Sequence, residues 1–223
     1  MRKIIAIALI VLVGCTNESD IDLLSQDLRI IDEFPGLGAT KVSTIGDSRF
    51  ISYGGSEVRR SIDKNAYNDL YFVGSLQDSY GYGHDAVGGD GSPQLLERYD
   101  DIPNADIYVI LFGTNDLWME SIDVPFETLS FIISNKISKG SKVYYCKQTP
   151  RDDYRDAYHI ELDEAIINEF DGVKGFEYID LRTPLLNLDG TFNHNLYDDH
   201  VHPNNEGGKI MGQVIANKID ETN

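Results

Sequence analysis

The stretch KVSTIGDSRF, residues 41–50, carries the first signals for both the fold and the chemistry of this chain. Its first five residues are largely apolar and β-rich, which predicts a short strand. Gly46 then permits a tight turn, and Ser48 follows before a stretch with helical character. A serine at a strand-to-helix turn exposes its hydroxyl above a helix N-terminus, which suits an attacking oxyanion. Taken alone, the tripeptide equally fits a simple helix N-cap at Asp47 or Ser48.

After residues 41–45, four more short apolar runs alternate with helical patterns along the chain. The predicted strands are residues 41–45, 69–73, 106–112, 142–146 and 176–179. Apolar residues at helical spacing predict helices around 126–137, 162–170 and 210–219. Because the strands are separated by more than a hairpin needs, they predict a parallel sheet covered by helices. The pattern indicates an α/β sandwich of the doubly wound type, with its site beyond the carboxyl ends of the strands.

A second polar group follows the third predicted strand, in the sequence LFGTND at residues 111–116. The side-chain amide of Asn115 can donate a hydrogen bond to negative charge that develops in a transition state. Loss of one such donor from an oxyanion hole typically costs about 10²–10³-fold in rate. The alternative is an ordinary turn, because Gly, Thr, Asn and Asp all favour turns.

A third polar group, YDDHVHPN at residues 197–204, precedes the last predicted helix. Asp199 and His202 are close enough for the carboxylate to hold one imidazole nitrogen while the other nitrogen faces a serine. A metal site is the competing interpretation. It would draw on the nearby carboxylates and imidazoles Asp198, Asp199, His200, His202 and His194.

Together, Gly-Asp-Ser near the start, Gly-x-Asn-Asp after a middle strand and Asp-x-x-His-Pro before the last helix resemble the SGNH (GDSL-type) hydrolases. The three motifs occur in the family's order and cover nearly the whole domain. The resemblance implies a three-layer α/β/α sandwich of flavodoxin-like type, with a central, mostly parallel, five-stranded sheet.

The resemblance also implies roles for individual residues. Ser48 is expected to be the nucleophile, His202 the general base and Asp199 the residue that orients it. Asn115 and the backbone N–H of Ser48 are expected to stabilise the oxyanion. No metal ion or organic cofactor is required by this mechanism.

The family's remaining oxyanion donor is a glycine N–H after the second strand, and Gly89 matches it best. Gly88 is the alternative donor, and in so glycine-rich a loop both fit ordinary turn residues as well. Arg49 departs from the family pattern because an apolar residue usually follows the serine. His200 stands where a glycine is common, but neither departure removes a catalytic group.

The N-terminus predicts export and lipid attachment. Residues 1–14 have a positive end and an apolar run too short to span a bilayer, which is typical of a signal peptide. Cys15 completes a resemblance to a bacterial lipobox, so we expect it to be lipidated, with residues 15–37 as lipidated cysteine and tether and 38–223 as the hydrolase domain. An ordinary secretory signal or an uncleaved anchor is the alternative. The expected location is the outer face of a bacterial membrane, periplasmic or at the cell surface.

The net charge and the cysteine content limit the kinds of partner that the chain can bind. The formal charge of −18 becomes −20 once Arg2 and Lys3 leave with the signal, and such a surface repels nucleic acid and anionic lipid headgroups. With Cys15 lipidated, Cys146 has no disulfide partner and is expected to be a buried thiol. We expect a monomer that contacts the membrane only through its lipid anchor.

The sequence therefore predicts a serine esterase that acts on a small-molecule or glycan ester. Aromatic residues in the loop at 77–91, among them Tyr80 and Tyr82, and Trp118 after the third strand are candidates for a rim that stacks on sugar rings. Short acyl chains, including O-acetyl groups of carbohydrates, are favoured because no long apolar lid segment is present. The alternatives are a lysophospholipase or thioesterase, a metal-dependent hydrolase, and an inactive glycan-binding module.

Overall fold

The computed structural model of the chain describes residues 39–51, 54–67 and 69–222. The predicted signal peptide 1–14, the predicted lipidation site Cys15 and the predicted tether 15–37 lie outside these residues. In the part that is described, no helix is both long and apolar enough to cross a lipid bilayer.

Seven strands of the described residues form one mostly parallel sheet in the order β3-β4-β1-β5-β6-β7, with β2 also paired to β1. Their bounds are β1 Thr40–Gly46, β2 Leu70–Phe72, β3 Leu76–Gln77, β4 Gly83–Ala86, β5 Ile107–Leu111, β6 Lys142–Cys146 and β7 Phe176–Ile179. Only the pair β3–β4 is antiparallel. The predicted α/β fold class is confirmed, but the expected number of five strands was too low.

Of the two additional strands, β4 lies beside β1, and β3 pairs with the far side of β4. β2 pairs with Thr40–Val42 at the start of β1, and β4 pairs with Ile45 and Gly46 at its end. β4 has the sequence GHDA and lacks an apolar pattern, yet it is buried because its polar groups are hydrogen-bonded. Asp85 accepts hydrogen bonds from Ser43 Oγ at 2.8 Å and from Ser75 N at 2.9 Å. Polar burial of this kind carries no hydrophobic signal in the sequence.

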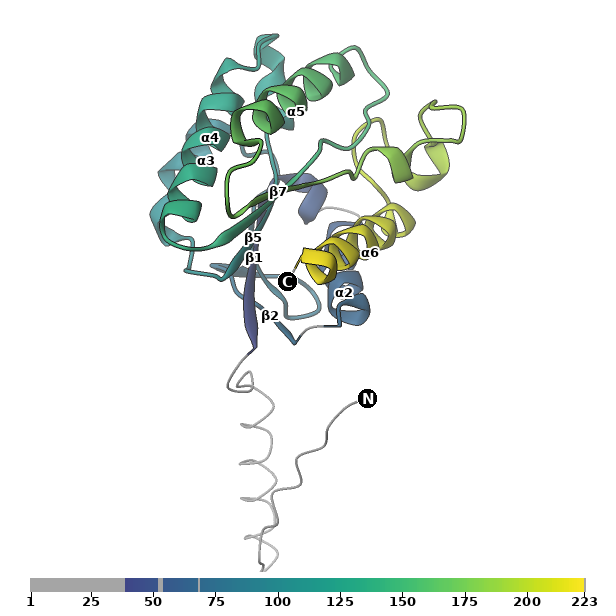
Figure 1. The fold of residues 1–223 in the computed structure, drawn as a ribbon. Coiled ribbons are helices and arrows are strands. Elements are labelled where there is room, and N and C mark those ends of the chain that lie inside the picture. Colours follow the sequence, from purple (N-terminus) through teal and green to yellow (C-terminus); the bar gives the residue numbers. More distant parts are fainter. Residues whose placement is uncertain (1–38, 52–53, 68, 223) are drawn as a thin grey trace, which may run out of the picture. The chain divides into compact units, whose positions relative to one another are not determined.

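Helices cover both faces of the sheet (Figure 1). α2 (Gly55–Asn65) and α6 (Asn205–Thr222) pack on one face, and α3 (Ser92–Glu97), α4 (Asp123–Ser138) and α5 (Asp156–Phe170) pack on the other. The predicted helices correspond to α4, α5 and α6, whereas α2 and α3 were not predicted.

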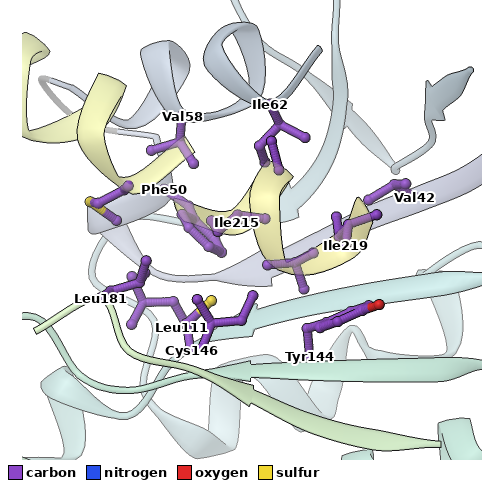
Figure 2. Close-up of a cluster of buried hydrophobic side chains, with 14 of the residues drawn as sticks. Val42, Phe50, Val58, Ile62, Leu111, Tyr144, Cys146, Leu181, Ile215 and Ile219 are labelled. Carbon is purple, nitrogen blue, oxygen red and sulfur yellow. The ribbon is translucent and has the colours of Figure 1, made fainter. Parts of the chain in front are cut away.

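Side-chain alternation along β5 supplies both cores. Ile107, Val109 and Leu111 join the cluster with α2 and α6, which Figure 2 shows in close-up. Tyr108 and Ile110 point into the opposite cluster with α3, α4 and α5. Because successive strand residues face opposite sides, one fully buried strand stabilises both layers at once.

α2 and α6 approach each other closely through glycines. A Cβ added to Gly208 would lie 2.1 Å from the carbonyl oxygen of Gly54, and one added to Gly212 would lie 2.4 Å from that of Val58. Larger residues at these positions would force the helices apart. The close contact brings the chain just before α6 next to the segment that follows β1.

Candidate active site

Ser48 lies where β1 ends, as the strand-exit argument predicted. It begins a single 3₁₀ turn, Ser48–Phe50, and not a long helix. Asp47 is the N-cap of this turn and accepts a hydrogen bond from the backbone N–H of Arg49 at 3.1 Å. The capping interpretation is thus correct for Asp47, and it leaves the Ser48 hydroxyl available for another partner.

That partner is His202, which lies 154 positions away in the sequence. The distance from Ser48 Oγ to His202 Nε2 is 2.8 Å, and the distance from His202 Nδ1 to Asp199 Oδ2 is 2.7 Å. The second oxygen of Asp199 accepts hydrogen bonds from the backbone N–H groups of Val201 and His202, both at 2.8 Å. The carboxylate is therefore fixed on its own loop and orients the imidazole toward the serine. Such a line can pass a proton from the hydroxyl to the imidazole.

The surroundings of Asp199 favour its ionised form. Burial alone would raise its pKa, but hydrogen bonds from the His202 ring and from the Val201 and His202 backbone lower the pKa to about 2. At neutral pH the group is a carboxylate and can stabilise a positive charge on the imidazole.

Asn115 lies at the carboxyl end of β5 and lines the same cavity as Ser48. Gly113, with a φ of 115°, turns the chain into the 3₁₀ helix Thr114–Met119 that carries Asn115. The Asn115 side-chain amide donates one hydrogen bond, of 2.9 Å, to the carbonyl oxygen of Asp90. Since the amide carries two N–H groups, a second donor remains for a substrate oxygen.

Gly88 and Gly89 follow β4 and are both exposed. Gly89 has a φ of 82° and directly precedes Asp90, whose carbonyl oxygen Asn115 binds. This contact ties the glycine loop to the Asn115 segment. Neither glycine is among the described residues that line the cavity, so the predicted donor role of Gly89 stays a prediction.

The cavity at Ser48 has a volume of about 260 Å³. It is lined by Ser48, Thr114, Asn115, Trp118, Arg151, Arg155, Asp199, His200, Val201 and His202. Arg151 and Arg155 were missed from the sequence. They follow β6, so the strand-exit argument that identified Ser48 and Asn115 applies to them equally.

Comparison with known proteins shows the family of this chain. The model of the GDSL-like Lipase/Acylhydrolase family matches residues 44–210, three quarters of the chain. The chain belongs to this family. The predicted resemblance is thereby confirmed, and the protein is an esterase or acylhydrolase of the GDSL family.

Solved structures share the fold of this GDSL-family chain. A carbohydrate esterase of family 3 from Talaromyces cellulolyticus is 20% identical, with a TM-score of 0.66 over 82% of this chain and 97% of that chain. The family 3 carbohydrate esterase from Clostridium thermocellum is 18% identical, with a TM-score of 0.66 over the same shares. A GDSL-like lipase from Bacteroides thetaiotaomicron is 20% identical, with a TM-score of 0.64 over 88% and 98%. No curated protein sequence matches the chain.

Only one of the aromatic residues predicted to form a rim lies at the GDSL-family site. Trp118 lines the cavity and is 69% exposed. The hydroxyl of Tyr80 instead bonds Glu57, and the hydroxyl of Tyr82 bonds Asp63 at 2.8 Å. Both tyrosines are thus held against α2, so Trp118 alone of these three aromatic residues remains a candidate for the predicted rim.

The residues of the competing metal interpretation are not brought together. His202 faces Ser48 and Asp199, whereas His194 approaches Asp152 at 3.7 Å and His200 approaches Asp153 at 3.8 Å. Within the described ranges, no three His, Cys, Asp or Glu side chains are arranged to hold a metal ion.

Arg49, the main departure from the family pattern, is buried under the nucleophile. Its guanidinium binds both carboxylate oxygens of Asp47, at 2.9 and 2.7 Å, and reaches Thr149 Oγ1 at 3.5 Å. Asp47 therefore neutralises the positive charge of Arg49, at the position after the serine where the family usually has an apolar residue. Cys146 is buried as expected, and burial raises the pKa of its thiol.

Proposed function

We propose that the chain is a serine esterase that hydrolyses short-chain carboxylic esters through an acyl-enzyme on Ser48. The observation that carries this proposal is the continuous hydrogen-bonded line from Ser48 through His202 to Asp199, at a cavity that Asn115 also lines. Nucleophile, base and orienting carboxylate within hydrogen-bond reach are the geometric signature of this mechanism.

In the proposed reaction, His202 takes the proton of Ser48 as the hydroxyl oxygen attacks the ester carbonyl. The side chain of Asn115 and the backbone N–H groups of Ser48 and Gly89 donate to the resulting oxyanion. His202 then gives the proton to the leaving alcohol. Water repeats these steps on the acyl-enzyme and releases the carboxylic acid.

For the substrate, we favour O-acetyl or similar short acyl groups on carbohydrates. A cavity of about 260 Å³ is small beside the roughly 300–1,000 Å³ typical of ligand pockets, which disfavours the long chain of a lysophospholipid. The exposed ring of Trp118 suits stacking on a sugar. Two of the similar structures are described as carbohydrate esterases, which agrees with this choice.

The proposed location is the outer face of a bacterial membrane, with Cys15 lipidated after removal of residues 1–14. Incorporation of a labelled fatty acid into the wild-type chain, and its loss in Cys15→Ser, tests this. Labelling that persists in Cys15→Ser would overturn it.

Hydrolysis of p-nitrophenyl acetate, butyrate and decanoate tests the activity. We expect turnover to fall at least about 10⁴-fold in Ser48→Ala, as for other serine hydrolases that lose the nucleophile, and to decrease with acyl length. Ser138→Ala, in an exposed turn of α4, is the matched control and is expected to match the wild type. Equal activity of Ser48→Ala and wild type would contradict the proposal, and a wild type inert toward all three esters would favour a binding module.

A further inference from the structure

Arg155 differs from the other arginines in the described part of the chain. Six of these seven arginines form an ion pair with a carboxylate, and Arg155 does not. The paired ones are Arg49, Arg59, Arg60, Arg98, Arg151 and Arg182. In a protein with a net charge of −18, an arginine without a carboxylate partner is a local exception that needs a cause.

The guanidinium of Arg155 is also short of a hydrogen-bond acceptor. Its Nε is buried and has no hydrogen-bond partner, and its Cζ lies 5.4 Å from the centre of the Tyr154 ring. A buried donor without an acceptor is costly, because it has lost its water without replacement. Arg155 also lines the Ser48 cavity, so a substrate oxygen there can accept a hydrogen bond from its guanidinium.

Arg155 lines the cavity without a direct ion pair, although the carboxylate of Asp153 interacts with it electrostatically at longer range. Arg151 is neutralised by Asp153, at 2.9 and 2.6 Å, and also donates to Thr114 Oγ1 at 2.7 Å. Asp199 is the one carboxylate among the described residues of the lining, and it is engaged with His202. Arg155 is thus the charged group of the lining that no direct ion pair engages, in the same cavity as Ser48.

We propose that Arg155 binds an anionic group, a carboxylate or a phosphate, on the alcohol part of the ester. This inference rests on the proposed function. Because the acyl group proposed there is short, an anionic group at a distance from the reacting carbonyl carbon must belong to the alcohol part. The planar guanidinium suits both anions because it can donate two parallel hydrogen bonds. Arg155 is therefore a specificity residue that selects acidic alcohols, and Trp118 supplies the stacking face beside it.

The test uses two pairs of esters that differ only in charge. The first pair is methyl 3-O-acetyl-glucuronide and the corresponding glucuronamide, and the second is 1-acetylglycerol 3-phosphate and 1-acetylglycerol. For each pair, kcat/KM of the charged ester is divided by that of the neutral one. This ratio cancels any general loss of activity in a variant.

We expect the wild-type ratio to be tenfold or more in at least one pair. Arg155→Gln is expected to bring it near one through a higher KM for the charged ester, and Arg155→Lys to retain part of it. Lys174→Gln removes the same charge from an exposed position just before the amino end of β7, whereas the site lies beyond the carboxyl ends of the strands, and this variant is expected to keep the wild-type ratio. A preference in the first pair alone assigns a carboxylate, and one in the second alone assigns a phosphate.

A wild-type ratio near one in both pairs, or a ratio that persists in Arg155→Gln, would overturn the inference. In either case, Ser48-dependent hydrolysis of the neutral esters would leave the proposed function intact. If the wild type hydrolyses none of these esters and no p-nitrophenyl ester, the proposed function fails and the inference fails with it.

Discussion

The backbone N–H of Gly54 donates a hydrogen bond of 3.1 Å to the carbonyl oxygen of Pro203. This contact joins the segment after Ser48 to the residue directly after His202. A Cβ at position 54 would lie only 2.0 Å from the carbonyl oxygen of Asn204. The distance between nucleophile and base thus depends on a glycine outside the three recognised motifs.

Gly54→Ala is therefore expected to lower both kcat and Tm, because the loop that carries His202 must move to admit the methyl group. Gly172→Ala is the control. Its φ of 72° makes it strained, but a Cβ there would meet nothing within 4 Å, so only Tm should fall. Kinetics on p-nitrophenyl acetate and thermal unfolding separate the two effects. An unchanged kcat in folded Gly54→Ala would contradict this account.

Asp199→Asn is expected to lower kcat about 10⁴-fold with little change in KM, as the corresponding substitution does in a well-studied serine protease. The amide cannot hold the imidazole in the tautomer that accepts the serine proton, nor stabilise the imidazolium. Asp198→Asn, at the exposed neighbouring position, should behave as wild type. A loss of less than tenfold in Asp199→Asn would mean that the carboxylate does not act through His202.

Asn115→Ala is expected to lower kcat by about 10²–10³-fold, the usual cost of one lost oxyanion donor. The substitution also removes the hydrogen bond to Asp90, so Tm must be measured beside kcat. Asp90→Ala retains the backbone acceptor and controls for changes in that loop. If kcat of Asn115→Ala falls less than threefold, the amide serves the loop alone.

Local sequence patterns, apolar runs followed by polar residues, predicted the central strands and the catalytic candidates after them. Three of the five predicted strands, β1, β5 and β6, were largely buried runs in the interior of the sheet, and Ser48 and Asn115 follow two of them. The position of Arg155 after β6 was open to the same strand-exit argument, but only the folded chain shows that Arg155 lacks a direct ion pair. Likewise, β4 is buried through hydrogen bonds to Asp85, and hydrophobic periodicity does not report such burial.

Arg49→Met tests the buried ion pair under the nucleophile. Removal of one partner leaves the Asp47 carboxylate buried and uncompensated, which typically costs about 3–5 kcal/mol of unfolding free energy. The double variant Asp47→Asn/Arg49→Met should recover much of this loss. Denaturant unfolding measures both. Equal stability of Arg49→Met and wild type would show that Asp47 is satisfied without the arginine.

Asp163 makes stability depend on pH. Burial raises its pKa to about 7, against hydrogen bonds from Gln148 N and Tyr145 Oη that lower it. Because the folded-state pKa lies above the unfolded value of about 4, its contribution to stability is full below pH 4 and is lost as the pH rises through 7. Between these values the unfolding free energy should fall by up to about 1.4 kcal/mol per pH unit from this group.

Asp163→Asn should remove that slope, whereas Glu164→Gln, at the exposed next position, should keep it. Urea unfolding of the three proteins at pH 4, 5, 6 and 7 gives the comparison. Since other groups titrate in all three alike, the difference between the curves isolates Asp163. Parallel curves for wild type and Asp163→Asn would mean that the buried carboxyl is already ionised at pH 4, held by its donors at Gln148 and Tyr145.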